Sequence, residues 1–268
     1  MNWNQWNRRY APDKSLLFGA ATNDKVDCGN SGSLTAGTSN VSYAVVFKIK
    51  TFTSNRILCS HNKNDGNGGP IFRLTGTTEL EALWANSSNA TAISNDLALV
   101  VGVFYLGFAV YNWADTQPRL YIKNIGNNAI REAGYAGGAT NGSGTLATTI
   151  SDVIGNNATA SPASAFQGNI GLCCRFSRVL TVPEMNALSM AIYAGQPNPV
   201  IDPAFYIPLG KNIGPQLDLS GRGFHGTITG ATLNEGLTFS SLRTVSPAKG
   251  ASGHARLLVG ERNLAVLG

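Results

Sequence analysis

The chain has 268 residues, of which 43% are hydrophobic and 13% are charged, about half the charged fraction of an average soluble protein. The length suits one large all-β domain, and the hydrophobic fraction can fill its core. The formal net charge of +5 comes from scattered Lys and Arg without interleaved aromatic residues. This pattern argues against a nucleic-acid-binding surface.

The first 14 residues are aromatic and basic and show no hydrophobic period. They contain no apolar signal core, which argues against classical secretion. We predict an arm over residues 1–14 whose Trp3, Trp6, Arg8 and Arg9 contact neighbouring subunits. Stacking of Trp3 or Trp6 on a sugar is the alternative.

Short apolar runs separated by Gly, Asn, Asp, Ser and Thr begin at Leu16. Many short strands joined by turn residues predict a β-sandwich or barrel, and no alternating βα pattern supports a parallel sheet. The clearest runs cover residues 43–49, 56–59, 71–74, 80–84, 119–122, 153–154, 170–176, 205–209 and 226–229.

Residues 97–113 form an uncharged and almost wholly apolar run. A membrane-spanning helix needs about 20 such residues, and this run is shorter and contains Gly102 and Gly107. Its Val, Phe and Tyr content favours one or two buried strands, so no membrane insertion is expected.

One helix is expected near residues 182–194. Thr181 and Glu184 have the spacing of a capping box, and Leu180 and Met185 that of a hydrophobic staple. Further along the chain, the pattern weakens after about residue 240, and residues 241–268 are expected to form a tail.

The four cysteines are Cys28, Cys59, Cys173 and Cys174, without the spacing of a zinc site. Neighbouring positions of a strand point to opposite faces. We therefore interpret Cys173 and Cys174 as free thiols, at least one of them in the core. A disulfide between Cys28 and Cys59 is the open alternative for that pair.

Several motifs occur in the order typical of one superfamily. They are Leu16-Leu17-Phe18-Gly19 with Asp24-Lys25-Val26, Ser42–Phe47, Arg119–Asn124, Ile154-Gly155 with Phe166–Gly171, and Arg178–Met185. Together they resemble the laminin-G-like or concanavalin-A-like lectin and glucanase superfamily. The resemblance implies an all-β, concanavalin-A-like jelly-roll sandwich of two antiparallel sheets over residues 15–240.

A further motif follows the expected helix. Tyr206–Leu209, Leu217–Gly226 and Gly230-Ala231-Thr232 resemble a family element that many members carry before the sandwich. Its place after the helix is similar to bacteriophage virion-associated members. This resemblance implies a particle protein that leaves the cell without a signal peptide.

The acidic residues give little support for catalysis. Glu79 and Glu81 would share one strand face, but the glycosidases of this superfamily carry a third acid where Leu83 stands here. We therefore predict an exposed, solvated strand face and no enzyme activity. The histidines His61, His225 and His254 lie outside any nucleophile motif and are expected on loops or the surface.

Calcium is the one ion that the resemblance suggests. Asp24, Asp27 and Asp65 could supply oxygen ligands. Asp65 lies in the loop Asn62–Asn67, which has one carboxylate and one Lys. An ordinary turn is the favoured interpretation of that loop, and no cofactor is expected.

Three functions follow from these observations. The first is a structural or decoration protein of a virus particle, on the particle surface or otherwise extracellular, with other virion proteins or copies of itself as partners and glycans as ligands. The second is a free-standing carbohydrate-binding module. The third, of low weight, is a glycoside hydrolase.

Overall fold

The computed structural model divides the chain into two units, Met1–Thr238 and Phe239–Gly268. Every residue described below belongs to the first unit, so the predicted tail and the predicted arm up to residue 13 lie outside the described residues. The described residues are 14–19, 24–30, 34, 38–53, 55–61, 69–75, 78–85, 90–94, 96–115, 117–124, 129–135, 150–158, 164–194, 196, 198–200, 202–210 and 214–234.

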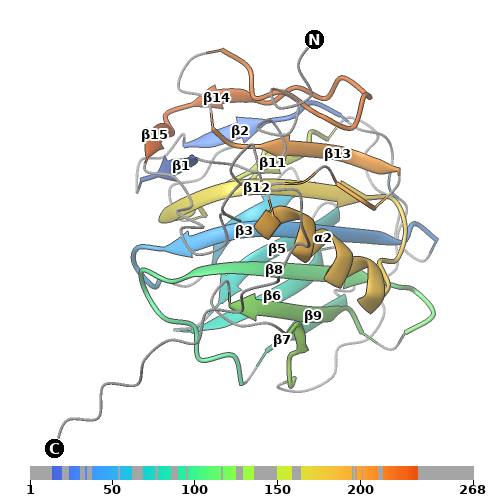
Figure 1. Ribbon diagram of the computed structural model, residues 1–268. Coiled ribbons are helices and arrows are strands. Elements are labelled where there is room, and N and C mark those ends of the chain that lie inside the picture. Colours follow the sequence, from blue (N-terminus) through green and yellow to red (C-terminus); the bar gives the residue numbers. More distant parts are fainter. Residues whose placement is uncertain are drawn as a thin grey trace, which may run out of the picture. The chain divides into compact units, whose positions relative to one another are not determined.

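The first sheet has eight antiparallel strands in the order β10-β9-β8-β3-β12-β1-β15, with β13 also paired to β12. Long strands occupy its centre (Figure 1). Its members are β1 (Ser15–Phe18), β3 (Val41–Ile49), β8 (Phe104–Tyr111), β9 (Arg119–Asn124), β10 (Arg131–Glu132), β12 (Gly168–Phe176), β13 (Pro203–Pro208) and β15 (Thr232–Asn234).

The second sheet has seven antiparallel strands in the order β14-β2-β11-β4-β5-β6-β7. Its members are β2 (Lys25–Asp27), β4 (Arg56–Ser60), β5 (Gly69–Thr75), β6 (Glu79–Ala85), β7 (Ala90–Ile93), β11 (Val153–Ile154) and β14 (Thr227–Thr229). The predicted fold class, a sandwich of two antiparallel sheets with one short helix, is confirmed.

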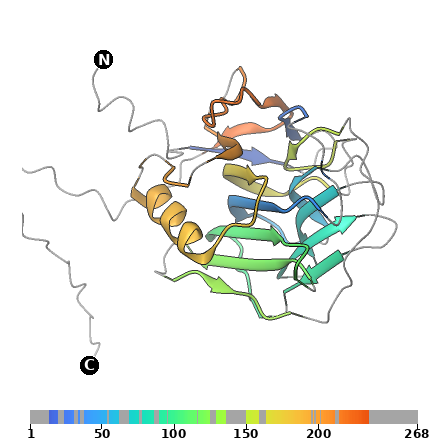
Figure 2. The ribbon, with the colours of Figure 1, turned by 90° about the vertical axis from the view of Figure 1, so that its right-hand side faces the viewer.

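The main core lies between the two sheets (Figure 2). Alternate residues of each strand point into it, because successive side chains leave a strand on opposite faces. Tyr43, Val45 and Phe47 of β3 are wholly buried there, opposite Phe72 and Trp84 of the second sheet. Trp84 also stands edge-on to Tyr111, with ring centroids 5.7 Å apart.

The helix α2 (Val182–Ala194) has the predicted bounds and cap. The Thr181 N–H donates to Glu184 Oε2 at 2.9 Å, and the Glu184 N–H reaches Thr181 Oγ1 at 3.4 Å. Arg178 binds the same carboxylate through Nη1 and Nη2, and this hydrogen bonding lowers the pKa of Glu184 from 4.5 to about 2. The capping box therefore also holds the end of β12 to the helix.

The helix covers the outer face of the eight-stranded sheet (Figure 2). Met185, Leu188, Ala191 and Ile192 are its buried apolar residues. Lys123 of β9 places Nζ 4.6 Å from the ring centroid of Tyr193, and burial lowers the pKa of this lysine. The attraction between the ammonium group and the aromatic ring offsets part of the cost of burying this charge beneath the helix.

The apolar run at residues 97–113 is centred on one strand, β8. It lies between β3 and β9, and seven of its eight residues, all except Phe104, are buried, so both faces of this strand are covered. The interpretation as a central strand is therefore confirmed. Among the described residues, no helix combines the length and hydrophobicity required to cross a membrane.

The segment after the helix completes both sheets. From it, β13 pairs with β12, β14 with β2, and β15 with β1. Asp218 organises the turn between these strands: its Oδ1 accepts the Tyr206 and Ser220 N–H groups, and its Oδ2 accepts the Phe224 N–H. The motif at residues 206–226 is thus held together by the hydrogen bonds of Asp218, and it places Phe224 beside β14.

All four cysteines are buried and free. Cys173 joins the core between the sheets, whereas Cys174 faces the opposite side of β12. Burial raises the pKa of each thiol, which makes the thiolate scarce. The interpretation of Cys173 and Cys174 as free thiols is confirmed, and the alternative disulfide between Cys28 and Cys59 is absent.

Candidate functional site

The residues predicted to act in assembly, Trp3, Trp6, Arg8 and Arg9, lie outside the described residues. Asp65 of the predicted calcium set lies outside them as well. Their roles stay predictions. The described part of the chain carries the other candidate residues.

Asp24 precedes β2 and Asp27 is its last residue, and both make local contacts. Asp24 is buried, and its Oδ2 accepts the Gly19 N–H at 2.5 Å. Asp27 accepts the Gly29 N–H at 3.0 Å and lies 3.7 Å from Lys25 Nζ. Within the described residues, no group of three or more His, Cys, Asp or Glu side chains could hold a metal ion.

Glu79 and Glu81 do lie on one face of β6, away from the core residues Leu80 and Ala82. The prediction that this face is exposed and solvated is wrong for Glu81, whose side chain is only 6% exposed. Arg73 lies directly across the ladder from Glu81 and donates to it at 2.7 Å. The reason for the difference is this cross-strand partner, which neutralises the carboxylate.

Glu79 is engaged separately, since its Oε2 accepts the Ser94 hydroxyl at 2.6 Å. The two carboxylates thus have different partners, one cationic and one neutral. Neither belongs to the lining of the two pockets described next. Each carboxylate therefore links β6 to a neighbouring segment of the sheet, Glu81 to β5 and Glu79 to Ser94 after β7.

The larger pocket is an open groove of about 640 Å³ beside β2 and β14. The two strands are paired, with Thr227 opposite Asp27 and Thr229 opposite Lys25, so their side chains form one polar floor. Phe224 and His225 come from the Asp218 turn and contribute an aromatic ring and an imidazole. The groove therefore combines hydroxyl, carboxylate, ammonium and aromatic groups on a fixed sheet.

Sequence reasoning missed this groove. Phe224 and His225 were visible only as part of a turn motif, and Thr227 and Thr229 only as a short strand. Their meeting with β2 requires the pairing of strands about 200 residues apart, which the ladder between Ile228 and Val26 establishes.

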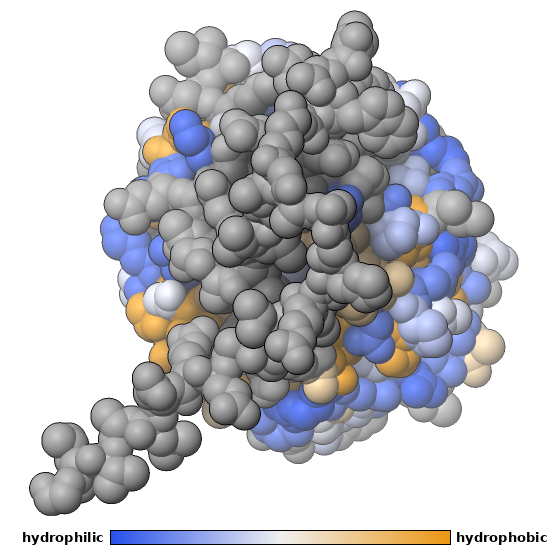
Figure 3. Space-filling model, viewed as in Figure 1, coloured by the Kyte–Doolittle hydropathy of each residue, from blue (hydrophilic) through white to orange (hydrophobic). Residues whose placement is uncertain are grey.

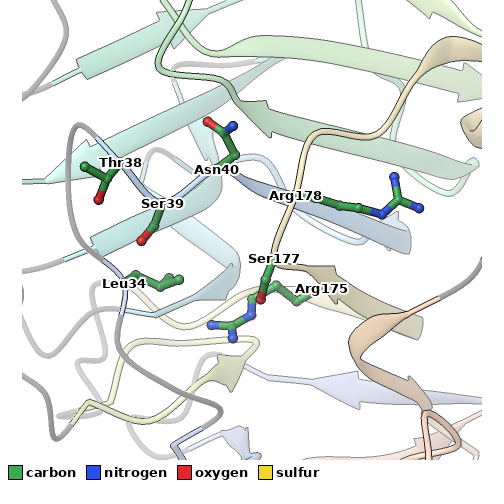
Figure 4. A pocket seen from close by; sticks show the side chains of 7 residues that line it. All are labelled: Leu34, Thr38, Ser39, Asn40, Arg175, Ser177 and Arg178. Carbon is green, nitrogen blue, oxygen red and sulfur yellow. The ribbon is translucent and has the colours of Figure 1, made fainter.

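The smaller pocket has a volume of about 260 Å³ and lies at one end of β3 and β12. Figure 4 shows the hydroxyls of Ser39 and Ser177 and the guanidinium of Arg175 on its Leu34 side, whereas the guanidinium of Arg178 points away. The lining residues are Leu34, Thr38, Ser39, Asn40, Arg175, Ser177 and Arg178.

A buried ionic cluster lies behind this pocket. Arg175 Nη1 is 3.0 Å from Asp152 Oδ1, and His61 Nδ1 is 3.1 Å from the same oxygen. All three side chains are about 1% exposed. Arg175 belongs to the first sheet, whereas Asp152 and His61 adjoin β11 and β4 of the second, so the cluster ties the two sheets together.

The prediction of a loop or surface position holds for His225, which is exposed on the groove. His61 also lies outside the strands, but it is buried and so has no surface position. His61 is buried because it follows β4 directly and faces Arg175 and Asp152 across the sandwich. His254 lies outside the described residues. One feature of the sequence indicated the buried ionic cluster: Arg175 is a lone charge inside the apolar run at residues 170–176.

The described surface seen in Figure 3 is mainly hydrophilic, with hydrophobic colour in small separate areas. The most exposed large apolar residues are Met190 at 69% and Val100 at 55%. Isolated residues of this kind are ordinary on protein surfaces. The two pockets are therefore better candidates for function than an apolar patch.

No protein-family model matches the sequence, and no curated protein matches it. Solved structures do match. The native heptameric SAP-like pentraxin of Limulus polyphemus superposes with a TM-score of 0.55 at 13% identity, over 85% of this chain and 98% of the pentraxin.

A putative carbohydrate-binding protein of Bacteroides ovatus gives a TM-score of 0.51 at 15% identity, over 84% of this chain and 60% of that protein. The enzymatically active domain of tailspike protein 2 of bacteriophage CBA120 gives 0.51 at 16% identity, over 74% of this chain and 30% of that domain. These likenesses show a concanavalin-A-like, lectin-like jelly roll. At such identities they show the fold alone.

Proposed function

We propose that this chain is a non-catalytic, carbohydrate-binding jelly roll that a virus particle, of phage type, displays on its surface. The observation that carries the glycan binding is the groove over β2 and β14, which is open, polar and bordered by an aromatic ring. The carbohydrate-binding description of the Bacteroides ovatus neighbour, which has the same fold, supports the same ligand class.

The chemistry of the groove suits a neutral sugar. Sugar hydroxyls both donate and accept hydrogen bonds, and Thr227, Thr229 and Asp27 offer matching groups on paired strands. Phe224 offers an apolar face for the C–H side of a sugar ring. Because the floor is a sheet ladder, these groups are held in place before the ligand arrives, which reduces the ordering cost.

The test is a glycan array followed by titration calorimetry with the full chain. We expect binding to at least one neutral oligosaccharide, weakened at least about tenfold by Phe224→Ala, which corresponds to about 1.4 kcal/mol. Thr227→Val removes an exposed hydroxyl with little change in shape, and it should also weaken binding. It keeps the test decisive in case Phe224→Ala disturbs folding.

Met190→Ala is the matched control, because Met190 is exposed on α2 and outside the groove lining. It should leave glycan affinity unchanged. Absence of any array hit at high protein concentration, or equal affinity of the Thr227→Val variant and the parent for every hit, would remove the groove as a glycan site.

The particle role is supported by the aromatic and basic composition of residues 1–14, by the position of the motif after the helix, and by the fold that this chain shares with a phage tailspike domain. On this proposal Trp3, Trp6, Arg8 and Arg9 contact other virion proteins or further copies of the chain. A free-standing extracellular carbohydrate-binding module is the alternative.

Sedimentation of the full chain distinguishes the two. We expect assemblies larger than a monomer for the parent, and a shift to monomer when Trp3 and Trp6 are both replaced by Ala. A parent chain that stays monomeric at all concentrations would favour the free-standing module.

The absence of catalysis is also part of the proposal. Glu81 is held by Arg73 and Glu79 by Ser94, so neither carboxylate is placed as a shared acid–base pair. Incubation with polysaccharides should release no new reducing ends, and Glu79→Gln with Glu81→Gln should change nothing. Release that the double substitution abolishes would show that the chain is a glycosidase.

A further inference from the structure

The pocket at the end of β3 and β12 differs chemically from the groove. Seven of the described residues line it, and among these are two arginines and no acid. The carboxylates that neutralise these arginines, Asp152 and Glu184, lie outside the lining. Among the described lining residues, the walls therefore carry the Arg175 guanidinium with hydroxyl and amide groups, and no carboxylate.

The guanidinium of Arg175 is the fixed charge of this pocket. It is about 1% exposed and is held from behind by Asp152 at 3.0 Å. A buried guanidinium has already lost its shell of bulk water on folding, so the binding of an anion to it carries a smaller desolvation cost. The low local dielectric strengthens the attraction at the same time.

Two hydroxyls complete the arrangement. Ser39 precedes β3 and Ser177 follows β12, and Figure 4 shows both hydroxyls on the same side of the pocket as the Arg175 guanidinium. The Trp113 indole N–H donates to the Ser39 carbonyl at 2.9 Å, and the Asn40 side-chain oxygen accepts the backbone N–H of Trp113. These bonds hold the segment that forms one wall.

We propose that this pocket binds the carboxylate of a single acidic sugar residue, with the carboxylate toward Arg175 and ring hydroxyls toward Ser39 and Ser177. The volume of about 260 Å³ lies just below the range of about 300–1,000 Å³ for drug-sized ligands, so one ring fits and an oligosaccharide does not. The inference extends the proposed glycan binding to a second site, with charge selectivity that the groove lacks.

The experiment compares two sugars that differ in one group. Glucuronate carries a carboxylate where glucose carries a hydroxymethyl group, and acetate carries the carboxylate without the ring. Binding of each to the full chain is measured by ligand-observed NMR titration. We expect glucuronate to bind at least about tenfold more tightly than glucose, because charge-assisted hydrogen bonds are the stronger ones, and more tightly than acetate.

Two variants locate the site. Ser177 is exposed at the mouth, so Ser177→Tyr should narrow the pocket and weaken glucuronate binding at least about tenfold without removing a buried contact. The pair Arg175→Met with Asp152→Asn removes both charges together and should abolish the preference for glucuronate over glucose. Unfolding curves show whether each variant is folded.

Phe224→Ala is the control that separates this inference from the proposed groove. Glucuronate binding that survives Phe224→Ala but not Ser177→Tyr supports the pocket. Equal affinity for glucuronate and glucose, equal affinity for glucuronate and acetate, or a glucuronate preference unchanged in a folded Ser177→Tyr variant would overturn it. If neutral glycans still bind through Phe224 in that case, the proposed function stands without the second site.

Discussion

Two arginines three residues apart, Arg175 and Arg178, make ion pairs in opposite surroundings. Arg175 binds Asp152 between the sheets, with both side chains about 1% exposed. Arg178 binds Glu184 at the start of α2, with side chains 34% and 31% exposed. Burial gives the first pair a large desolvation cost and a large penalty if one partner is lost, whereas the second pair is hydrated and easily replaced.

The same charge chemistry therefore serves two purposes. The Arg175 pair joins the two sheets and forms the base of a pocket, and the Arg178 pair fixes where a helix begins. A third pair, Arg131 with Asp96, lies at the surface, with side chains 47% and 42% exposed. The three pairs form a series in which burial, more than the identity of the partners, should decide the energetic consequence.

The largest effect is expected for Asp152→Ala. The substitution leaves the Arg175 guanidinium buried beside His61 without its carboxylate, and the free energy of unfolding should fall by about 3–5 kcal/mol. Chemical denaturation followed by tryptophan fluorescence measures it. The double variant Arg175→Met with Asp152→Asn is the control and should lose less, because no unbalanced charge stays behind. A loss below about 1 kcal/mol for Asp152→Ala would mean that water reaches Arg175.

Glu184→Gln should have a smaller effect. It keeps the shape of the cap but removes the anion that Arg178 and the Thr181 N–H hold. A loss of about 1 kcal/mol is expected from the partly exposed ion pair and the helix dipole together. The same denaturation measurement applies, and a loss as large as that of Asp152→Ala would contradict the distinction between the two pairs.

The contribution of Glu184 should also depend on pH. Its pKa is lowered to about 2 in the folded chain, against about 4.3 in an unfolded one. A lowered folded-state pKa gives stability that is complete above the unfolded value and is lost as the pH falls toward the folded value. The difference between parent and Glu184→Gln should therefore shrink between pH 4.5 and pH 2, and a constant difference would exclude this origin.

Arg131→Ala should have the smallest effect. Arg131 contacts Asp96 across an exposed edge of the sheet, where screening by solvent limits such a pair to about 0–1 kcal/mol. The unfolding free energy should change by less than about 0.5 kcal/mol, and added salt should reduce even that change. A loss comparable to that of Glu184→Gln would show that exposure is a poor guide to these pairs.

Local features of the fold could be predicted because each depends on neighbours in the sequence. Thr181 and Glu184 are three residues apart and form the cap whatever else surrounds the helix. The β8 run was recognisable from its apolar composition alone. The run at residues 80–84 was likewise recognisable as a strand, and its Trp84 is wholly buried in β6.

The candidate sites could not be predicted in the same way. The groove needs β2 and β14 side by side, although Val26 and Ile228 are far apart along the chain. Glu81 looked solvent-exposed in the sequence, because nothing in it indicates that Arg73 lies directly across the ladder. Strand register decides both cases, and register depends on how the whole sandwich packs.

The sequence by itself determined the all-β class, the helix with its cap and the burial of the central strands, because side-chain period and capping are properties of a few consecutive residues. Only the tertiary structure decided that Arg175 meets Asp152 and His61, which lie 23 and 114 residues away. Side-chain alternation can place Arg175 on the inner face of its strand. Its contact with the carboxylate of Asp152, which adjoins the opposite sheet, depends on how the two sheets pack together.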